Sequence, residues 1–95
     1  MHKPCKVIIA KFAEKQLRKL PTQIKEHIRS WAISIELYGI REIRRLPGYH
    51  DEPLKGDRVG QRSVRLNRSY RLIYEETESG ELIVIGVKEI NKHEY

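Results

Sequence analysis

The sequence contains a single cysteine, Cys5, which excludes an internal disulfide and makes a cysteine-based zinc site improbable. The histidines show no spacing typical of metal ligands; they are His2, His27, His50 and His93. We therefore expect no metal and no other cofactor. A chain without disulfides is also typical of a reducing compartment, so the expected location is the cytoplasm.

Long apolar runs are also missing. No stretch approaches the roughly 18 apolar residues that a membrane span needs, and the N-terminal run is too short for a secretory signal. The phosphate-binding patterns GxxxxGK[ST] and GxGxxG are absent, as is the serine-hydrolase pattern GxSxG. With 95 residues, 39% of them hydrophobic and 34% charged, the chain is long enough for one globular domain, expected to span residues 1–95.

Hydrophobic periodicity predicts the N-terminal elements. Residues 6–10 (KVIIA) form a short β-branched run that indicates a first strand. A helix is expected from Lys11 to the break at Pro21, and a second helix from there to Gly39. Residues 40–47 favour one more short helical turn. The apolar stripes of the two longer helices are Ala13, Leu17 and Leu20, then Ile24, Ile28, Trp31 and Ile35.

The second half of the chain indicates a loop followed by a sheet. Residues 48–60 contain three glycines and one proline, so we expect a loop there. Residues 61–66, 70–75 and 81–87 then predict three strands joined by tight turns. The predicted fold is α+β: an N-terminal strand and two to three helices packed on one face of a small, mainly antiparallel sheet. The other face of that sheet would be open.

The net charge of +6 is unevenly distributed. Only Asp57 interrupts the positive residues between positions 55 and 71, which are Lys55, Arg58, Arg62, Arg65, Arg68 and Arg71. This run indicates a polyanion site; the alternative is a solvated sheet face whose arginines pair with nearby acids. Strand alternation predicts that Arg65 is exposed on the open face, but it does not by itself gather all the arginines there.

An open basic sheet face would suit metal-free RNA cleavage. The loop beside it carries His50, Glu52 and Lys55, and the C-terminal residues add His93 and Tyr95. Such cleavage requires a base for the ribose 2′-hydroxyl, an acid for the leaving 5′-oxygen, and cations for the charge on phosphorus. Arginine suits the phosphate because its planar fork is bidentate and always charged.

Three stretches in this order carry a family resemblance: DEPLKG, QRSVRLNRSYRLIYE and the terminal KHEY, with KVIIAKFAEKQLRKLP before them. The set resembles the RelE/ParE superfamily of toxins from bacterial type II toxin-antitoxin modules, nearest to its RelE, YoeB and HigB branches. The resemblance implies a RelE-like fold and a ribosome-dependent endonuclease that cuts mRNA in the A site by 2′-hydroxyl attack and inhibits translation. The implied partners are a cognate antitoxin, the ribosome with its RNA, and mRNA.

The resemblance also implies roles for individual residues. Glu52 falls where the YoeB branch has a proposed general base, and Lys55 occupies the basic position after it. Arg65 and Arg71 fall on arginines that hold the scissile phosphate, and His93 and Tyr95 on the terminal acid and the base-stacking or orienting group. Expected substrate-binding residues are Lys55, Arg62 and Lys92. The protein would thus end at its own active site.

Several alternatives stay open at this point. His50 or Glu94 would also serve as the general base. The sequence departs from the YoeB pattern because Glu94 separates His93 from Tyr95, which puts the imidazole and the phenol on opposite sides of an extended strand. It departs from the RelE pattern because Ser63 and Arg65 stand where lysines are used. The competing function is a non-nucleolytic ParE-like inhibitor of DNA gyrase, and a third is a decayed toxin that only supports operator binding.

Overall fold

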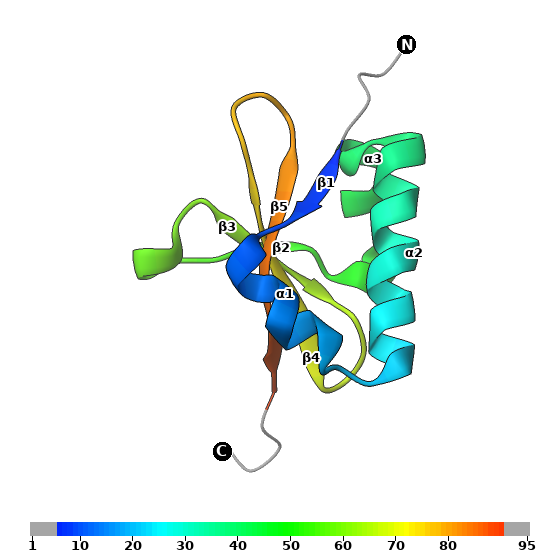
Figure 1. The fold of residues 1–95 in the computed structure, drawn as a ribbon. Coiled ribbons are helices and arrows are strands. Elements are labelled where there is room, and N and C mark those ends of the chain that lie inside the picture. The colour runs from blue at the N-terminus through cyan, green and yellow to red at the C-terminus, as the bar shows by residue number, and fades with distance from the viewer. Residues whose placement is uncertain (1–5, 91–95) are drawn as a thin grey trace.

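The structure is a computed structural model that describes residues 6–90, and it consists of a five-stranded sheet with helices packed against it (Figure 1). The strand order is β1-β5-β4-β3-β2; β1 runs parallel to β5 and the other pairs are antiparallel. The strands are β1 (Val7–Ile9), β2 (Glu52–Pro53), β3 (Gln61–Arg65), β4 (Tyr70–Glu76) and β5 (Leu82–Glu89). The helices are α1 (Lys11–Arg18), α2 (Thr22–Tyr38) and α3 (Ile40–Arg44), with short 3₁₀ turns η1 (Pro47–Tyr49) and η2 (Gly56–Arg58). The predicted α+β class is confirmed.

The core lies between α2 and one face of the sheet. The predicted α2 stripe of Ile24, Ile28, Trp31 and Ile35 is buried, as are Val64, Leu72, Tyr74, Leu82 and Val84 from the sheet. The rings of Trp31 and Tyr74 meet with centroids 5.3 Å apart and planes tilted by 52°. This aromatic contact ties α2 to the central strand β4.

The loop expected at residues 48–60 contains an element that sequence patterning did not predict. Glu52 and Pro53 form β2, an edge strand whose Cα partners in β3 are Ser63 and Arg62. A two-residue strand that contains proline has no readable alternation, and proline lacks the N–H that an inner strand requires. At the edge of the sheet that missing N–H costs nothing, so the strand forms.

A β-bulge changes which side chains of β5 face the core. Leu82 and Val84 point to the core; then the pairing shifts so that Ile73 lies opposite Gly86 and Leu72 opposite Val87. The extra residue reverses the alternation beyond this point. Val87 therefore points to the core, and Lys88 points to the opposite face.

Beyond the bulge, the edge of β5 is bonded by a side chain of α1 and no longer by the backbone of β1. The β1–β5 pairing ends at Ile9, and the Gln16 side chain then serves as the partner of Val87. Its Nε2 donates to the Val87 carbonyl at 2.6 Å, and its Oε1 accepts from the Val87 N–H at 3.0 Å. One amide side chain thus replaces a strand at this edge, and it holds α1 against the sheet while Ala13 and Leu17 enter the core.

Candidate functional site

Three positive side chains line up on the sheet face opposite α2, which we call the open face. Arg65 of β3 is the Cα partner of Arg71 in β4, and Arg71 is the partner of Lys88 in β5. Directly opposed residues of antiparallel strands share a face, and neighbouring strands lie about 4.8 Å apart. Arg65, Arg71 and Lys88 therefore form a cation row across three strands. Like charges this close favour an anionic ligand.

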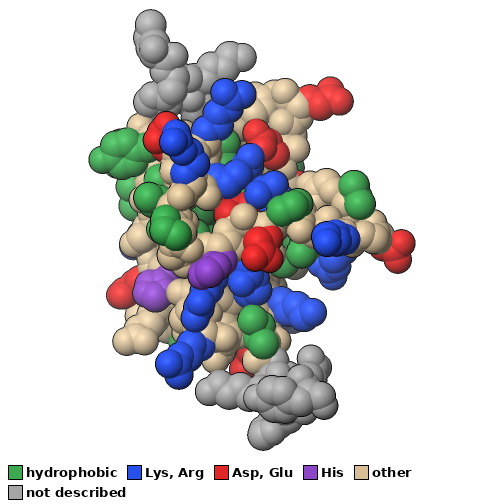
Figure 2. Space-filling model, turned by 180° about the vertical axis from the view of Figure 1, so that it is seen from behind, with side chains coloured by type: hydrophobic (Ala, Val, Ile, Leu, Met, Phe, Trp, Pro, Cys, Tyr) green, Lys and Arg blue, Asp and Glu red, His purple; other side chains and the backbone are tan. Residues whose placement is uncertain are grey.

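The positive charge of the cation row is not neutralised within residues 6–90. None of its three members forms an ion pair there, whereas Arg18, Arg44, Arg45 and Arg62 do. Arg65 and Lys88 are exposed, and Arg71 is half-buried. Seen from behind, Lys and Arg side chains extend down most of the molecule, with a few Asp and Glu among them (Figure 2).

Arg71 is held in place by neutral acceptors. Its Nε donates to the Ser63 hydroxyl at 2.6 Å, and its Nη2 donates to the His50 carbonyl at 2.8 Å and the Ser63 carbonyl at 3.4 Å. Ser63 is itself buried, with 4% of its surface exposed. These bonds orient the guanidinium and leave its charge available, as a phosphate ligand requires.

Glu52 shares the open face with the cation row. Its Cα partner is Ser63, whose hydroxyl contacts Arg71, so the carboxylate side chain extends from the edge strand on the same side of the sheet. Glu52 is exposed and makes no hydrogen bond or ion pair with residues 6–90. Lys55 is exposed in the loop after β2, outside the register of the row.

Arg62 lies apart from this arrangement, on the core-facing side of β3. Its Nε donates to Oδ1 of Asp51 at 2.5 Å, and the Asp51 side chain is 1% exposed. The Tyr74 hydroxyl donates to the other Asp51 oxygen at 2.7 Å, and Arg44 donates to that hydroxyl at 3.2 Å. Burial raises the pKa of the Tyr74 phenol well above its usual range, and the hydrogen bond to Asp51 raises it further. Arg62 therefore pairs with an acid, as the alternative interpretation of the basic run expected, but on the core-facing side of β3 and not on a solvated face.

The turn before β2 is fixed from both sides. Asp51 is bound by Arg62 and Tyr74, and the carbonyl of the preceding His50 is bound by Arg71. His50 has φ 43° and ψ 51°, a left-handed conformation that few residues adopt without support. These contacts hold the edge strand, and with it Glu52, beside the cation row.

The C-terminal candidates Lys92, His93, Glu94 and Tyr95 lie outside the described residues. The chain reaches Ile90 at the same end of the sheet as the cation row, where the Ile90 N–H donates to the Ser69 carbonyl at 2.6 Å. Among residues 6–90, no group of three or more His, Cys, Asp or Glu side chains is arranged to hold a metal ion. No helix in that range is long and apolar enough to cross a membrane.

Comparison with known proteins gives a consistent result for the fold. No protein-family model and no curated protein sequence matches the chain. Solved structures match over nearly its whole length, with a TM-score of 0.72 and 20% identity for the RelE–RelB complex from Pyrococcus horikoshii OT3, covering 95% of this chain and 99% of that one. The chain has the RelE/ParE toxin fold.

Two further structures extend this likeness to the RelE/ParE fold. The toxin–antitoxin complex RelBE2 from Mycobacterium tuberculosis has a TM-score of 0.69 and 22% identity, covering 93% of this chain and 100% of that one. The YoeB/ParE toxin from Agrobacterium tumefaciens has a TM-score of 0.63 and 25% identity, and the match covers 90% of this chain and 99% of that one. The RelE-like fold implied by the sequence resemblance is thereby confirmed.

Two residues of this candidate site were not predicted as functional. Lys88 joins the cation row only because the bulge reverses the alternation of β5, and an isolated sequence gives no signal of that shift. Ser63 lies two residues before Arg65, so the alternation that predicts Arg65 on the open face puts Ser63 there too, but the hydrogen bond from Arg71 to Ser63 depends on the register of β3 and β4.

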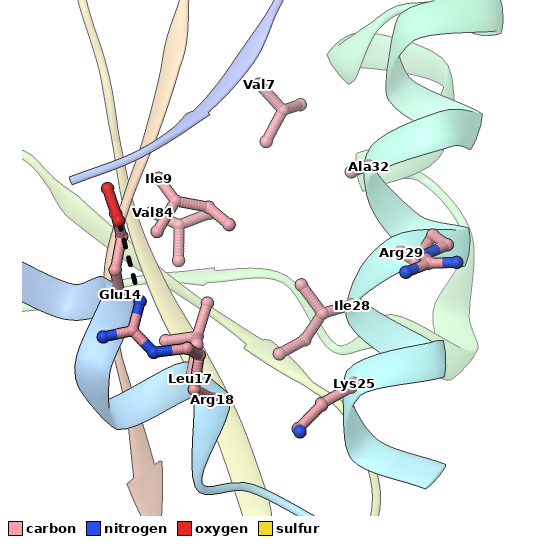
Figure 3. A pocket seen from close by; sticks show the side chains of 10 residues that line it. All are labelled: Val7, Ile9, Glu14, Leu17, Arg18, Lys25, Ile28, Arg29, Ala32 and Val84. Carbon is pink, nitrogen blue, oxygen red and sulfur yellow. Dashed lines mark ion pairs between the residues drawn. The ribbon is translucent and has the colours of Figure 1, made fainter. Parts of the chain in front are cut away.

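A groove lies between α1, α2 and β1 of this RelE-like chain (Figure 3). It encloses about 610 Å³. Its apolar lining consists of Val7, Ile9, Leu17, Ile28, Ala32 and Val84, and its charged lining of Glu14, Arg18, Lys25 and Arg29. Glu14 pairs with Arg18 at 4.0 Å, so Lys25 and Arg29 leave the groove positively charged beside an apolar floor. We call it the α1–α2 groove.

Proposed function

We propose that this chain is the toxin of a type II toxin-antitoxin module and an endoribonuclease that cleaves mRNA in the ribosomal A site. The observation that carries the proposal is the cation row of Arg65, Arg71 and Lys88, which has no ion-pair partner within residues 6–90 and shares its face with Glu52. An oriented arginine beside a free carboxylate provides both an anion site and a base. Cleavage would occur in the cytoplasm.

The proposed reaction requires no metal. Glu52 takes the proton of the ribose 2′-hydroxyl, and the resulting oxygen attacks the adjacent phosphorus. Arg71, Arg65 and Lys88 stabilise the additional negative charge on the phosphate. His93 protonates the leaving 5′-oxygen, so the products are a 2′,3′-cyclic phosphate and a 5′-hydroxyl. Tyr95 stacks on or orients a base, and Lys55 and Lys92 bind flanking phosphates; His50 and Glu94 remain the alternative bases.

Arg62 is not retained in this proposal as a substrate ligand. Its guanidinium is engaged by the buried Asp51 carboxylate, and moving it to RNA would leave that carboxylate without its closest cation. Its proposed role is to hold the turn that carries Glu52.

An antitoxin is the proposed partner. Of the similar solved structures, the one from M. tuberculosis is a toxin–antitoxin complex and the one from P. horikoshii is a RelE–RelB complex. The α1–α2 groove supports the same arrangement here, because its apolar floor and its cations Lys25 and Arg29 suit an acidic amphipathic segment (Figure 3). The exposed Arg41 of α3 forms no ion pair with residues 6–90 and would be available for a ribosomal RNA phosphate, whereas the exposed Arg45 would have to exchange its surface ion pair with Glu42 for such a contact.

The decisive test is to induce the chain in bacteria and map new mRNA 5′ ends. We expect ends at fixed codon positions for the wild type and none for Arg71→Ala, because that change removes the oriented phosphate ligand. Arg71→Lys keeps the charge but loses the planar fork that donates to Ser63 and His50 from two separate nitrogens, so we expect it to be strongly impaired. Lys6→Ala, which removes an exposed cation at the β1 end of the sheet, is the matched control and should cleave normally.

The same experiment separates the competing function. Growth arrest without new 5′ ends, together with inhibited DNA supercoiling, would establish a gyrase inhibitor instead. Arrest by Arg71→Ala equal to that of the wild type would refute the role assigned to the cation row.

A further inference from the structure

A hollow lies on the open face, next to the cation row. It encloses about 680 Å³ between α1 on one side and η2 with the start of β3 on the other. Ile73 and Gly86 lie at its floor, Phe12 and Gln61 at its two sides, and Lys88 at its boundary with the cation row. We call it the Phe12 hollow.

Phe12 is unusual because it is the single phenylalanine of the chain and is 77% exposed. The α1 residues that build the core are Ala13 and Leu17, whereas Phe12 and Gln16 share another side of the helix and line the hollow. An aromatic ring this exposed contributes little to the stability of the fold, yet it offers a flat apolar surface above the sheet.

The hollow continues the strand rows of the proposed catalytic site. Glu52, Ser63, Ile73 and Gly86 are successive Cα partners across the four strands β2 to β5, so one end of this row is the proposed base and the other end is the floor of the hollow. Lys88 follows Gly86 by two residues, a separation of roughly 7 Å along the strand. A phosphate at the cation row would therefore have room for an attached nucleotide in the hollow.

The polar side of the hollow also suits a base. Gln61 accepts a hydrogen bond from Arg58 at 3.3 Å through its Oε1, and its Nε2 makes no hydrogen bond with residues 6–90. Phe12 and Gln61 thus bring an aromatic face and an amide N–H donor to the same hollow, and these are the two kinds of group that recognise a base turned out of its stack.

We propose that the Phe12 hollow binds one unstacked base of the RNA, with Phe12 stacking on its face and Gln61 contacting its edge. The inference rests on the proposed function, since it assigns a base to the same RNA whose phosphate lies at the cation row. The hollow would also give the enzyme a preference for certain mRNA sequences, because an mRNA whose base fits the hollow best would be cleaved at the highest rate.

The test uses the full chain with ribosomes programmed with a short mRNA. The nucleotides of the A-site codon and the next nucleotide are made abasic one at a time, and the cleavage rate is measured for the wild type and for Phe12→Ala. We expect Phe12→Ala to slow cleavage of intact mRNA by about tenfold or more, the usual effect of losing one aromatic–base stack. At one nucleotide position, removing the base should lower the cleavage rate of the wild type. At that same position, Phe12→Ala should not lower the rate any further.

Matched variants separate stacking from damage to the fold. Phe12→Tyr keeps an aromatic face and should retain most of the rate, whereas Phe12→Leu keeps apolar bulk and should behave like Phe12→Ala. Leu37→Ala removes another exposed apolar side chain, 58% exposed on α2, and should have no effect.

The outcomes are distinguishable. If Arg71→Ala abolishes cleavage but Phe12→Ala cleaves every mRNA like the wild type, the inference is wrong and the proposed function stands. The inference is also wrong if Phe12→Ala lowers the cleavage rate by the same factor for every abasic mRNA, whichever position lacks its base. If the wild type cleaves no mRNA, both fail.

Discussion

At the scale of single residues, Tyr74 connects the core to the proposed site. Its ring is fully buried against Trp31, and its hydroxyl donates to the Asp51 carboxylate while accepting from Arg44. Asp51 directly precedes Glu52. One buried hydroxyl therefore helps determine where the proposed general base lies.

Removing this hydroxyl should destabilise the protein. Tyr74→Phe leaves the ring contact with Trp31 but takes a donor from a carboxylate whose side chain is 1% exposed. We expect the free energy of unfolding to fall by about 1–3 kcal/mol, measured by denaturant titration at pH 7. Tyr38→Phe, at a tyrosine that is 61% exposed on α2, is the control and should change nothing. Equal stability of Tyr74→Phe and wild type would show that the hydroxyl bond has no net value.

Because the pKa of Tyr74 is raised, the contribution of this contact to the free energy of unfolding should depend on pH. Burial, with the hydrogen bond to Asp51, favours the neutral phenol in the folded state, whereas the unfolded phenol ionises near its ordinary pKa of about 10. The stability due to the raised pKa is therefore complete below about pH 10 and is lost as the pH rises from there toward the folded pKa. Between about pH 10 and 11, wild type should lose stability more steeply than Tyr74→Phe; parallel curves would contradict this assignment.

At the scale of elements, the sequence predicted what depends on periodicity. The α2 stripe ending at Ile35, the helix break at Pro21 and the strands beginning at Gln61 and Tyr70 are all found. What it did not predict depends on pairing. The edge strand β2 exists only because β3 lies beside it, and the bulge in β5 arises from its register with β4.

The same distinction between periodicity and strand pairing explains which residues of the candidate site the sequence predicted. Alternation correctly placed Arg65 on the open face, and the structure adds Arg71 as its cross-strand partner. Arg62 was expected to bind substrate, but alternation already grouped it with Val64, and the structure gives it the buried partner Asp51. Only a three-dimensional arrangement brings Asp51 of the loop to β3. The roles of Lys92, His93 and Tyr95 stay predictions, because they lie outside the described residues.

An element-scale prediction concerns the edge where Gln16 replaces a strand. Gln16→Ala removes the donor and the acceptor that satisfy the Val87 backbone. We expect unfolding stability to fall by about 1–3 kcal/mol and the Val87 amide to exchange its hydrogen faster, with little change at Leu72 on the opposite strand. Gln16→Glu keeps the acceptor but not the donor, so it should protect the Val87 N–H better than Gln16→Ala. Unchanged exchange at Val87 in both variants would contradict this role.

At the scale of the whole molecule, the proposed RNA site and the proposed antitoxin site lie on different parts of the fold. The cation row and the Phe12 hollow lie on the open face of the sheet, whereas the α1–α2 groove lies between the helices and β1. Lys25 and Arg29, in the groove, are on α2, which packs on the core side. Antitoxin binding and RNA cleavage should therefore be separable by substitution.

The double variant Lys25→Glu/Arg29→Glu tests that separation. Both side chains are exposed, so the fold should persist, and reversing their charge should repel an acidic antitoxin segment while leaving Arg71 and Glu52 in place. We expect antitoxin affinity, measured with purified toxin, to fall at least about tenfold, the effect of roughly 1.4 kcal/mol, and mRNA cleavage to stay at the wild-type rate.

In cells, such a variant should arrest growth even when the antitoxin is co-expressed. The matched control Lys15→Glu/Lys19→Glu makes the same change in net charge at exposed positions that do not line the groove, and it should remain neutralised. If both double variants lose antitoxin equally, only the overall charge matters and the groove is not the docking site. If the Lys25/Arg29 variant binds antitoxin normally but no longer cleaves on ribosomes, the groove cations contact the ribosome instead.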